Sequence, residues 1–418
     1  MLALVVLLVC SFAILLGPEW DVTSEAEDQN QHHLLVIQSF ASQWPSPDIR
    51  DYRSATAPLW HLVHSIPLAL GAPIWALRLL MAVAGASLVL LVARVSIHLT
   101  GDDRAAWFAL PIAANPYLLS GSIWITTDVP ACLALSAACG ATLYGRAGAN
   151  ALLAMGTGVR QTGVWMAPAL ALMAWCSLGR DARLADRVRA AMSIVLPPLA
   201  VLGLLVWLWG GLTPPCYRDI HDRGVNLATP AHTLALIALI GAPFVSWRRV
   251  VECFSNQYGI LVAVAAIGLL MAVIVPTSYA REEGRWGGPL WIVVKYAPAL
   301  WSRTTVFMVL APCGALILYI LTKLAHESRQ NGSGLALGVA VLSLTAVNTA
   351  NSQCWERYTD LPLLVLLPWM AALGSRGQRE SERRQVLRGV LALTFIQLIL
   401  SARMVLLPLL GTPVFGTV

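Results

Sequence analysis

The sequence contains little charge, and this alone excludes most classes of protein. Only 12% of the 418 residues are Asp, Glu, Lys or Arg, against about a quarter in soluble domains. Lysine is nearly absent, with Lys295 and Lys323 as its two occurrences. Hydrophobic residues make up 57% of the chain, so a water-soluble globular fold is excluded and lipid must surround most of the protein.

Several chemical signatures are also missing. The sequence has no Walker loop, no G-x-G-x-x-G segment opening a helix and no serine elbow, so a nucleotide-hydrolysing pump is not predicted. It has no solenoid-length repeat, inverted duplication or low-complexity segment. The eight cysteines follow no metal-ligand spacing, and a metal at His221, Asp222 and His232 is the weaker interpretation of that loop. We therefore expect no metal, no cofactor and no nucleic-acid partner.

The hydrophobic residues occur in long stretches of the kind that cross a membrane. A span needs about 20 mostly apolar residues, and a backbone in lipid must satisfy its own hydrogen bonds as a helix. We predict an all-α, polytopic integral membrane protein with about 12 to 13 transmembrane helices in one domain, residues 1–418. The first stretch could be a signal peptide, but it lacks a basic start and a cleavage site, which favours a retained span. The stretches fall near 2–16, 77–97, 105–125, 128–145, 151–177, 189–210, 231–246, 257–276, 304–323, 333–348, 358–374 and 386–406.

Basic connectors predict which loops face the cytoplasm. Arginines and the second lysine cluster at 180–189, 248–249, 323–329 and 376–388, and such loops remain on the cytoplasmic side. The loops 211–230, 277–303 and 349–357 then lie on the opposite face, together with a large first loop at 17–60. Cys216 and Cys354 would share this outer face, where a disulfide is one interpretation.

One stretch conflicts with this topology unless it is broken. A single helix over 149–177 would leave the chain on the wrong side of the membrane at Arg180. Gly156, Gly158 and Gly163 surround Arg160 in this stretch, and glycines at that density commonly interrupt a membrane helix beside a cavity. We therefore predict two short helices, with Arg160 facing the outer side.

The first loop carries the best candidate for a general base. Glu25, Glu27 and Asp28 are followed by His32 about one helical turn further on. A carboxylate partly screened from water can accept a proton from an attacking hydroxyl. The alternative is a solvated acidic loop that only enforces an outside location.

Two polar residues adjoin or interrupt predicted spans. Asp128 could cap the helix that begins there, or contribute to a site. Arg160 is costly in apolar sequence unless it meets an anion or lines water, which favours anion binding over a structural ion pair.

Further cations and aromatic residues lie in the other outer loops. Their mixture suits a lipid phosphate, because cations neutralise the phosphate and tryptophans lie at headgroup depth. The alternative is an ordinary aromatic belt and, at Arg357, a pair with Glu356. With Arg160, the donor-phosphate candidates are Arg281, Arg285, Lys295, Arg303 and Arg357.

Taken in order, these motifs resemble the multi-spanning glycosyltransferases of the GT-C class. The likeness is closest to the dolichyl-phosphoglucose-dependent α-1,2-glucosyltransferases of N-glycan precursor assembly, although Gln29 stands where that family has glutamate. The matching segments are Asp28 with His32, Thr56 to Trp60, Thr127-Asp128, Arg160-Gln161-Thr162, Asp222-Arg223 through His232, and Arg357-Tyr358.

This resemblance implies an inverting transfer of a hexose, with glucose as the first candidate, from a polyprenyl-phosphate-linked sugar. The acceptor would be a glycan or a lipid-linked glycan at the non-cytoplasmic membrane surface. Asp28 would be the base, with Glu27 as its substitute. The substrate-binding candidates are His32, Thr56, Asp128, Gln161, Thr162, Asp222, His232 and Tyr358.

Location and a rival function follow from the same features. The preference for arginine over lysine favours a bacterial plasma membrane; in a eukaryote the membrane would be that of the endoplasmic reticulum. The rival is a multi-spanning secondary transporter or a flippase of lipid-linked sugars, which should carry its charges near the bilayer midplane.

Overall fold

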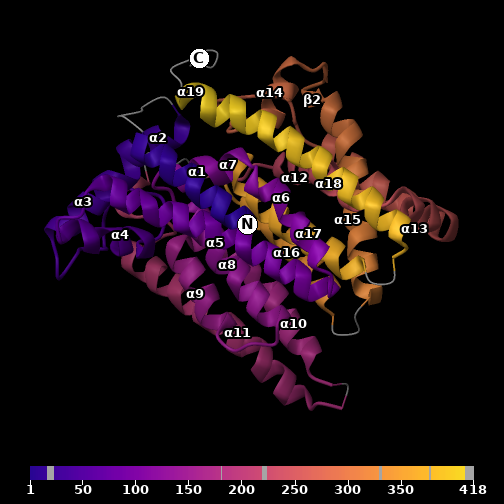
Figure 1. Cartoon of the computed structure of the whole chain (residues 1–418), viewed down its shortest axis with the longest axis horizontal. Coiled ribbons are helices and arrows are strands. Elements are labelled where there is room, and N and C mark those ends of the chain that lie inside the picture. The colour runs from indigo at the N-terminus through magenta and orange to yellow at the C-terminus, as the bar shows by residue number, and fades with distance from the viewer. Residues whose placement is uncertain (17–22, 180, 219–223, 329–331, 376–377, 410–418) are drawn as a thin grey trace.

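The computed structural model describes the chain except for residues 17–22, 180, 219–223, 329–331, 376–377 and 410–418. The described residues form helices and loops with one small β-hairpin, so the predicted all-α class is confirmed (Figure 1).

The helices of the N-terminal half alternate between long spans and short irregular segments. They are α1 (Leu2–Leu16), α2 (Ser24–Asp28), the π-helix η1 (Gln29–His33), α3 (Leu34–Ser42), α4 (Leu59–Ala69), α5 (Ile74–Thr100), the 3-10 helix η2 (Asp103–Ala109), α6 (Leu110–Ala113), α7 (Pro116–Ile123), α8 (Asp128–Leu143), α9 (Ala149–Val159), the 3-10 helix η3 (Gln161–Met166), α10 (Ala167–Ser177) and α11 (Leu184–Trp209).

The C-terminal half contains the hairpin and a largely buried helix, α17. Its elements are η4 (Pro215–Tyr217), α12 (Thr229–Gly241), η5 (Ala242–Phe244), α13 (Trp247–Val273), α14 (Pro289–Tyr296), β1 (Ala299–Leu300), β2 (Arg303–Thr304), α15 (Thr305–Ser328), α16 (Ser333–Thr349), α17 (Arg357–Gly374), α18 (Glu380–Ser401), the π-helix η6 (Ala402–Leu406) and α19 (Leu407–Leu409). The strands β1 and β2 pair antiparallel.

The long apolar helices confirm a polytopic membrane protein. Within the described residues, five helical segments are long and apolar enough to cross a membrane: α5, α11, α13, α15 and the segment beginning with α18. A sixth candidate is the pair α7 and α8, which bend by 113° at residues 124–127. Shorter apolar helices occupy four more of the predicted stretches, at α1, α9, α12 and α16. Several predicted spans are therefore short or broken helices, and of these breaks the sequence predicted the one at Arg160.

Helix α17 forms the centre of the molecule and α11 and α13 its edge. Every residue of α17 from Leu363 to Gly374 is buried. It contacts α5, α15 and α16. Helix α1 packs on α5, and its Val6, Cys10 and Ile14 belong to the same buried cluster. Little of α11 and α13 is buried, as expected of helices that face lipid. Figure 1 shows α11 and α13 at the margins, with α16 and α17 between them.

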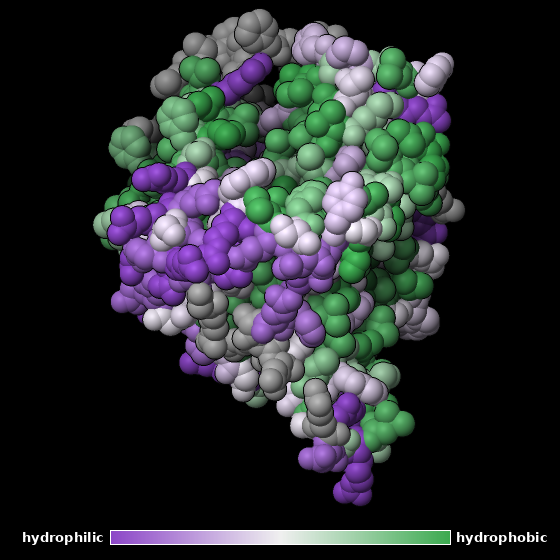
Figure 2. Space-filling model, turned by 90° about the vertical axis from the view of Figure 1, so that its right-hand side faces the viewer, coloured by the Kyte–Doolittle hydropathy of each residue, from purple (hydrophilic) through white to green (hydrophobic). Residues whose placement is uncertain are grey.

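One end of the helix bundle is held by an ion-pair network. Glu382, only 4% exposed at its side chain, lies 2.9 Å from Arg248 and 3.3 Å from Arg249. Arg104 similarly pairs with Glu380 at 3.2 Å. Figure 2 looks onto the side where α13 and α18 lie and shows a large patch of hydrophilic side chains bordered by hydrophobic surfaces, with a smaller hydrophilic group at the lower tip. The predicted cytoplasmic connectors around 248 and 380 thus meet at one end of the protein.

We expect Glu382→Ala to destabilise the protein by about 2 kcal/mol, because two arginines lose their shared carboxylate in a largely buried setting. The matched control is Glu380→Ala, whose side chain is 48% exposed and whose removal should cost about 0–1 kcal/mol. Thermal unfolding in detergent measures both, and equal effects would contradict the burial argument.

Hydrogen bonds, apart from the ion-pair network, connect the loops predicted on the outer face. The backbone amide of Cys216 donates to Asp51 at 2.8 Å, and Trp209 donates to Ile49 O at 2.9 Å. The amide of Cys354 donates to Gly284 O at 2.9 Å. The first loop therefore contacts loop 211–230, and loop 277–303 contacts loop 349–357. Cys216 and Cys354 are both free thiols, so the suggested disulfide is wrong.

Candidate active site

Asp28 and Arg357 bring the first loop to the start of the central helix. Asp28 ends α2, a short helix whose preceding Thr23 caps it by accepting from the amide of Ala26 at 3.1 Å. Its Oδ2 lies 3.2 Å from Nη1 of Arg357, the first residue of α17, and the two side chains are 20% and 15% exposed. Burial raises the pKa of Asp28, but the neighbouring basic groups, Arg357 first and then His33, His32 and Arg160, together outweigh burial, and the pKa lies below its ordinary value. The carboxylate is therefore ionised at neutral pH.

The predicted break at Arg160 is confirmed. Helix α9 ends at Val159, Arg160 is extended with φ −139° and ψ 121°, and η3 begins at Gln161. A Cβ atom on Gly163 would lie 3.0 Å from the carbonyl oxygen of Gly156. The two backbone segments can approach this closely because that position has no side chain.

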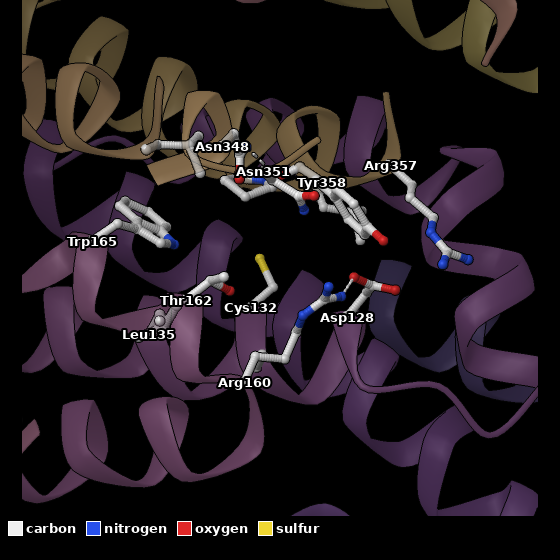
Figure 3. A pocket seen from close by; sticks show the side chains of 15 residues that line it. Asp128, Cys132, Leu135, Arg160, Thr162, Trp165, Asn348, Asn351, Arg357 and Tyr358 are labelled. Atoms are coloured by element: carbon white, nitrogen blue, oxygen red, sulfur yellow. Dashed lines mark hydrogen bonds and ion pairs between the residues drawn. The ribbon is translucent and has the colours of Figure 1, made fainter. Parts of the chain in front are cut away.

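Arg160 reaches the same region from the other side. Its guanidinium forms a hydrogen-bonded ion pair with the carboxylate of Asp128. Asp128 is the first residue of α8, and the preceding Thr127 does not cap that helix with its side chain. The guanidinium carbon of Arg160 also lies 4.8 Å from the centre of the Tyr358 ring, and that of Arg357 lies 5.4 Å from the same ring. Figure 3 shows Arg160 pointing to Asp128 below Tyr358, with Arg357 beyond the ring. Two arginines thus share one tyrosine.

A cavity lies between these residues. Its volume is about 50 Å³, which suits one or two water molecules, so a sugar phosphate needs side chains at the cavity to move. Asp128, Arg160, Thr162, Arg357 and Tyr358 line its polar side, while Cys132, Leu135, Trp165, Leu344 and Leu361 line its apolar side.

A pair of buried histidines, His33 and His61, lies beside Asp28, and the sequence analysis did not predict this pair. His33 Nε2 lies 3.8 Å from Asp28 Oδ2, and His33 Nδ1 lies 2.9 Å from His61 Nε2. Burial lowers the pKa of His33 to about 4 and that of His61 well below its ordinary value, so both are neutral at neutral pH. The predicted His32 instead contacts Tyr217 edge-to-face, with ring centroids 5.7 Å apart.

Glu27 does not share the site with Asp28. It is exposed, and its carboxylate accepts from Gln31 Nε2 at 3.1 Å. Glu25 is buried instead, at 8% exposure. Residues three apart on a helix share a face and adjacent residues do not, so Glu25 turns to the side of Asp28 and Glu27 turns away. The register of a helix over 24–28 was the signal that could have separated Glu25 from Glu27.

Two predicted phosphate-binding arginines are already occupied by protein atoms. Arg285, 6% exposed, donates to Ser278 O at 2.7 Å and to Glu283 at 2.6 Å. Arg303 donates to Val273 O at 3.0 Å and to Ile274 O at 3.3 Å. These carbonyls end α13, so Arg303 caps that helix. Both cations hold the outer loops in place, and neither lines the cavity.

The remaining cation candidates stack on aromatic rings outside the cavity. Arg281 lies 4.8 Å from the ring centre of Trp286, and Lys295 lies 5.4 Å from that of Tyr279. Of the six predicted donor-phosphate cations, the structure brings Arg160 and Arg357 together at the cavity.

The other predicted residues have mainly supporting positions. Gln161 Nε2 donates to Ala55 O at 2.6 Å and Leu212 O at 2.9 Å, which ties three segments together. Thr56 lies 3.1 Å from Ser54 through their hydroxyl groups. His232 is fully buried and stacks on Trp291, with ring centroids 5.1 Å apart. Asp222 lies outside the described residues.

The sequence left open an ion pair between Glu356 and its neighbour Arg357, but the Glu356 carboxylate binds elsewhere. Its carboxylate accepts from the amide of Leu290 at 2.8 Å, near the start of α14. Burial raises the pKa of Glu356 to about 8. Arg357 is therefore free to face Asp28.

The depressed pKa of Asp28 predicts how stability depends on pH. A carboxylate whose folded pKa lies below its unfolded value, about 3.9, adds stability above that value and loses it as pH falls through the folded pKa. The difference in unfolding temperature between the protein and Asp28→Asn should therefore be constant from about pH 5 to pH 8 and shrink below about pH 4. Differential scanning fluorimetry in detergent measures it, and a difference that grows toward acid would contradict the ion pair.

No family model and no curated protein matches the chain. In overall structure the chain is similar to the apo oligosaccharyltransferase of Archaeoglobus fulgidus, with a TM-score of 0.50, 14% identity, and coverage of 96% of this chain and 56% of that one. The two chains therefore share an all-α, polytopic membrane fold, and this chain spans little more than half the length of that protein.

A second structural neighbour is ArnT from Cupriavidus metallidurans, solved in the apo state and bound to undecaprenyl phosphate. The TM-score is 0.41 in both cases, with 15% and 14% identity, 95% coverage of this chain, and 76% and 77% coverage of those chains.

Proposed function

We propose that this protein is a membrane glycosyltransferase that moves a sugar from a polyprenyl-phosphate donor to a hydroxyl of a glycan or lipid-linked acceptor. The observation that carries this proposal is the ion pair of one carboxylate, Asp28, with Arg357, which lines one cavity together with a second guanidinium group, that of Arg160. A base and anion-binding groups side by side are what transfer from a phosphate donor requires.

The chemistry is a single displacement with inversion. The acceptor oxygen attacks the anomeric carbon, its proton moves to Asp28, and the bonding electrons of the sugar–phosphate bond leave with the phosphate. Negative charge grows on that phosphate in the transition state. Arg160 and Arg357 stabilise it there more than in the ground state, which lowers the barrier.

Arg357 couples donor binding to the strength of the base. Without a donor its positive charge holds the pKa of Asp28 down, which makes the carboxylate a weak base. A donor phosphate beside Arg357 would neutralise part of that charge, so the pKa of Asp28 would rise toward the value that burial favours. The base would then be strongest when the donor is bound.

The sugar and location rest on the sequence motifs rather than on the cavity. We propose a hexose, with glucose as the first candidate, because Asp28, Arg160-Gln161-Thr162 and Arg357-Tyr358 follow the order found in the glucosyltransferase family. The arginine-rich composition favours a bacterial plasma membrane with the site on the non-cytoplasmic face.

Transfer can be tested with purified protein in nanodiscs and a panel of labelled polyprenyl-phosphate sugars. We expect loss of the intact donor, formation of polyprenyl phosphate and a product of inverted configuration when acceptor glycans are supplied. A transporter or flippase would bind or move these lipids and leave the sugar–phosphate bond intact, and that result would overturn the proposal.

A further inference from the structure

A second, much larger cavity lies among the outer loops. Its volume is about 460 Å³, which is in the range of small-molecule binding sites. Four short segments of backbone form its walls, at 224–228, 275–276, 282–285 and 352–353. We call it the outer cavity.

The walls of the outer cavity are held in place by one buried side chain. Asn226, 5% exposed, donates through Nδ2 to Glu283 O at 2.9 Å and to Ser352 O at 2.8 Å. Its backbone amide donates to Thr349 O at 2.9 Å. Gly284, at φ +72°, packs so closely on Ser352 that a Cβ would lie 2.2 Å from the Ser352 carbonyl oxygen. The cavity is therefore preformed, and a ligand would not need to order these loops.

The charges at the outer cavity disfavour anions. Glu282 and Glu283 lie at its wall and are exposed. Among the described residues that line it, the one basic residue is Arg285, which already donates to Ser278 and Glu283. The carbonyl oxygen of the Gln353 side chain is buried without a hydrogen-bond partner among the described residues. Carboxylates and an unused carbonyl accept hydrogen bonds from hydroxyl groups, so the lining suits a neutral polyol and repels a phosphate.

The outer cavity also lies beside the candidate active site. Asn351 lines the small cavity, and the next two residues, Ser352 and Gln353, line the outer one. Gln353 is four residues before Arg357, so the chain can separate their Cα atoms by at most about 14 Å.

Aromatic rings connect the two regions. Trp286 and Trp355 contact edge-to-face at 5.3 Å, and Trp355 stacks on Tyr358 at 5.5 Å. Ring faces of this kind are apolar surfaces on which the C–H side of a sugar can lie.

We propose that the outer cavity binds the acceptor glycan, as a neutral oligosaccharide whose end reaches past Trp355 to Tyr358 and Asp28. This inference rests on the proposed function and adds the position and chemical class of its acceptor. The donor phosphate and the acceptor sugar then occupy separate sites divided by loop 349–357.

A glycan array tests this inference with nanodisc protein and immobilised neutral, sulfated and phosphorylated oligosaccharides as probes. We expect binding to neutral glycans and weak binding to anionic ones. Leu227→Trp, which fills the outer cavity, should reduce binding at least tenfold. The matched control is Leu212→Trp, because Leu212 is 59% exposed and Leu227 57% exposed in the same predicted outer loop, and Leu212 does not line the cavity.

A second variant keeps the test decisive if Leu227→Trp folds poorly. Gln353→Leu removes the unused carbonyl at similar size and should weaken neutral-glycan binding about tenfold, the effect of about one lost hydrogen bond. Absence of neutral-glycan binding, a preference for anionic glycans, or unchanged binding in both variants would overturn the inference. Cleavage of polyprenyl-phosphate sugars is measured separately, so its failure would refute the proposed function while the glycan-binding result stands by itself.

Discussion

Asp28→Asn should abolish sugar transfer while the protein still folds and inserts. Asparagine keeps the size and can still accept a hydrogen bond from Arg357, but it cannot take a proton from the acceptor hydroxyl. A positioned general base typically contributes 10²–10⁴ in rate, so we expect a loss of about 10³-fold. The rate of polyprenyl phosphate formation with saturating acceptor measures it.

The neighbouring Glu27→Gln is the control for that result. Glu27 is exposed and its carboxylate meets Gln31, so its variant should transfer at the wild-type rate. If Glu27→Gln is inactive and Asp28→Asn is active, the base is one residue earlier than the structure indicates.

Arg357→Ala should produce the second largest loss. Its guanidinium faces Asp28 and lines the cavity, so its removal takes away charge stabilisation of the leaving phosphate and leaves Asp28 buried without its partner. Loss of one preorganised donor commonly costs about 10²–10³ in rate, and Arg160→Ala should fall in the same range.

A change in the pH profile separates this role from simple loss of structure. In Arg357→Ala, burial is left to act on Asp28, so the acid limb of the transfer rate should move to higher pH than in the wild-type protein. The control is Arg104→Ala. The Arg104 side chain belongs to the ion-pair network with Glu380 and is 63% exposed, so its removal should change neither the transfer rate nor its pH profile. An unchanged rate in Arg357→Ala would remove it from the phosphate site.

Patterns that act over many residues were predictable from the sequence. The density of glycines around Arg160 predicted the break between α9 and α10, because such a run cannot hold a membrane helix together. The basic connectors predicted that Asp28, Arg160 and Arg357 would lie on one side, and the structure brings these three residues to one region.

The choice between neighbouring residues was not predictable. Glu25 and Glu27, or His32 and His33, differ only in which face of a short helix they occupy. That depends on where α2 and η1 begin and on how they pack against α4. A shift of one residue turns a side chain by about 100° around a helix, and no composition argument resolves such a shift.

Cation composition also pointed to more residues than the cavity contains. Arg285 and Arg303 occur in the right loop, but backbone carbonyls at Ser278, Val273 and Ile274 occupy their guanidinium groups. Tertiary contacts decide whether an arginine binds a ligand or a helix end, and these contacts cannot be predicted from sequence patterns.

The most direct test of this account is a cryo-EM structure of the protein in nanodiscs with undecaprenyl phosphate. We predict phosphate density within hydrogen-bond reach of both Arg160 and Arg357, beside the Asp28 carboxylate, with the Arg160–Asp128 pair opened to admit it. Phosphate density at Arg281 and Lys295 instead, with both site arginines still bound to their carboxylates, would contradict the account.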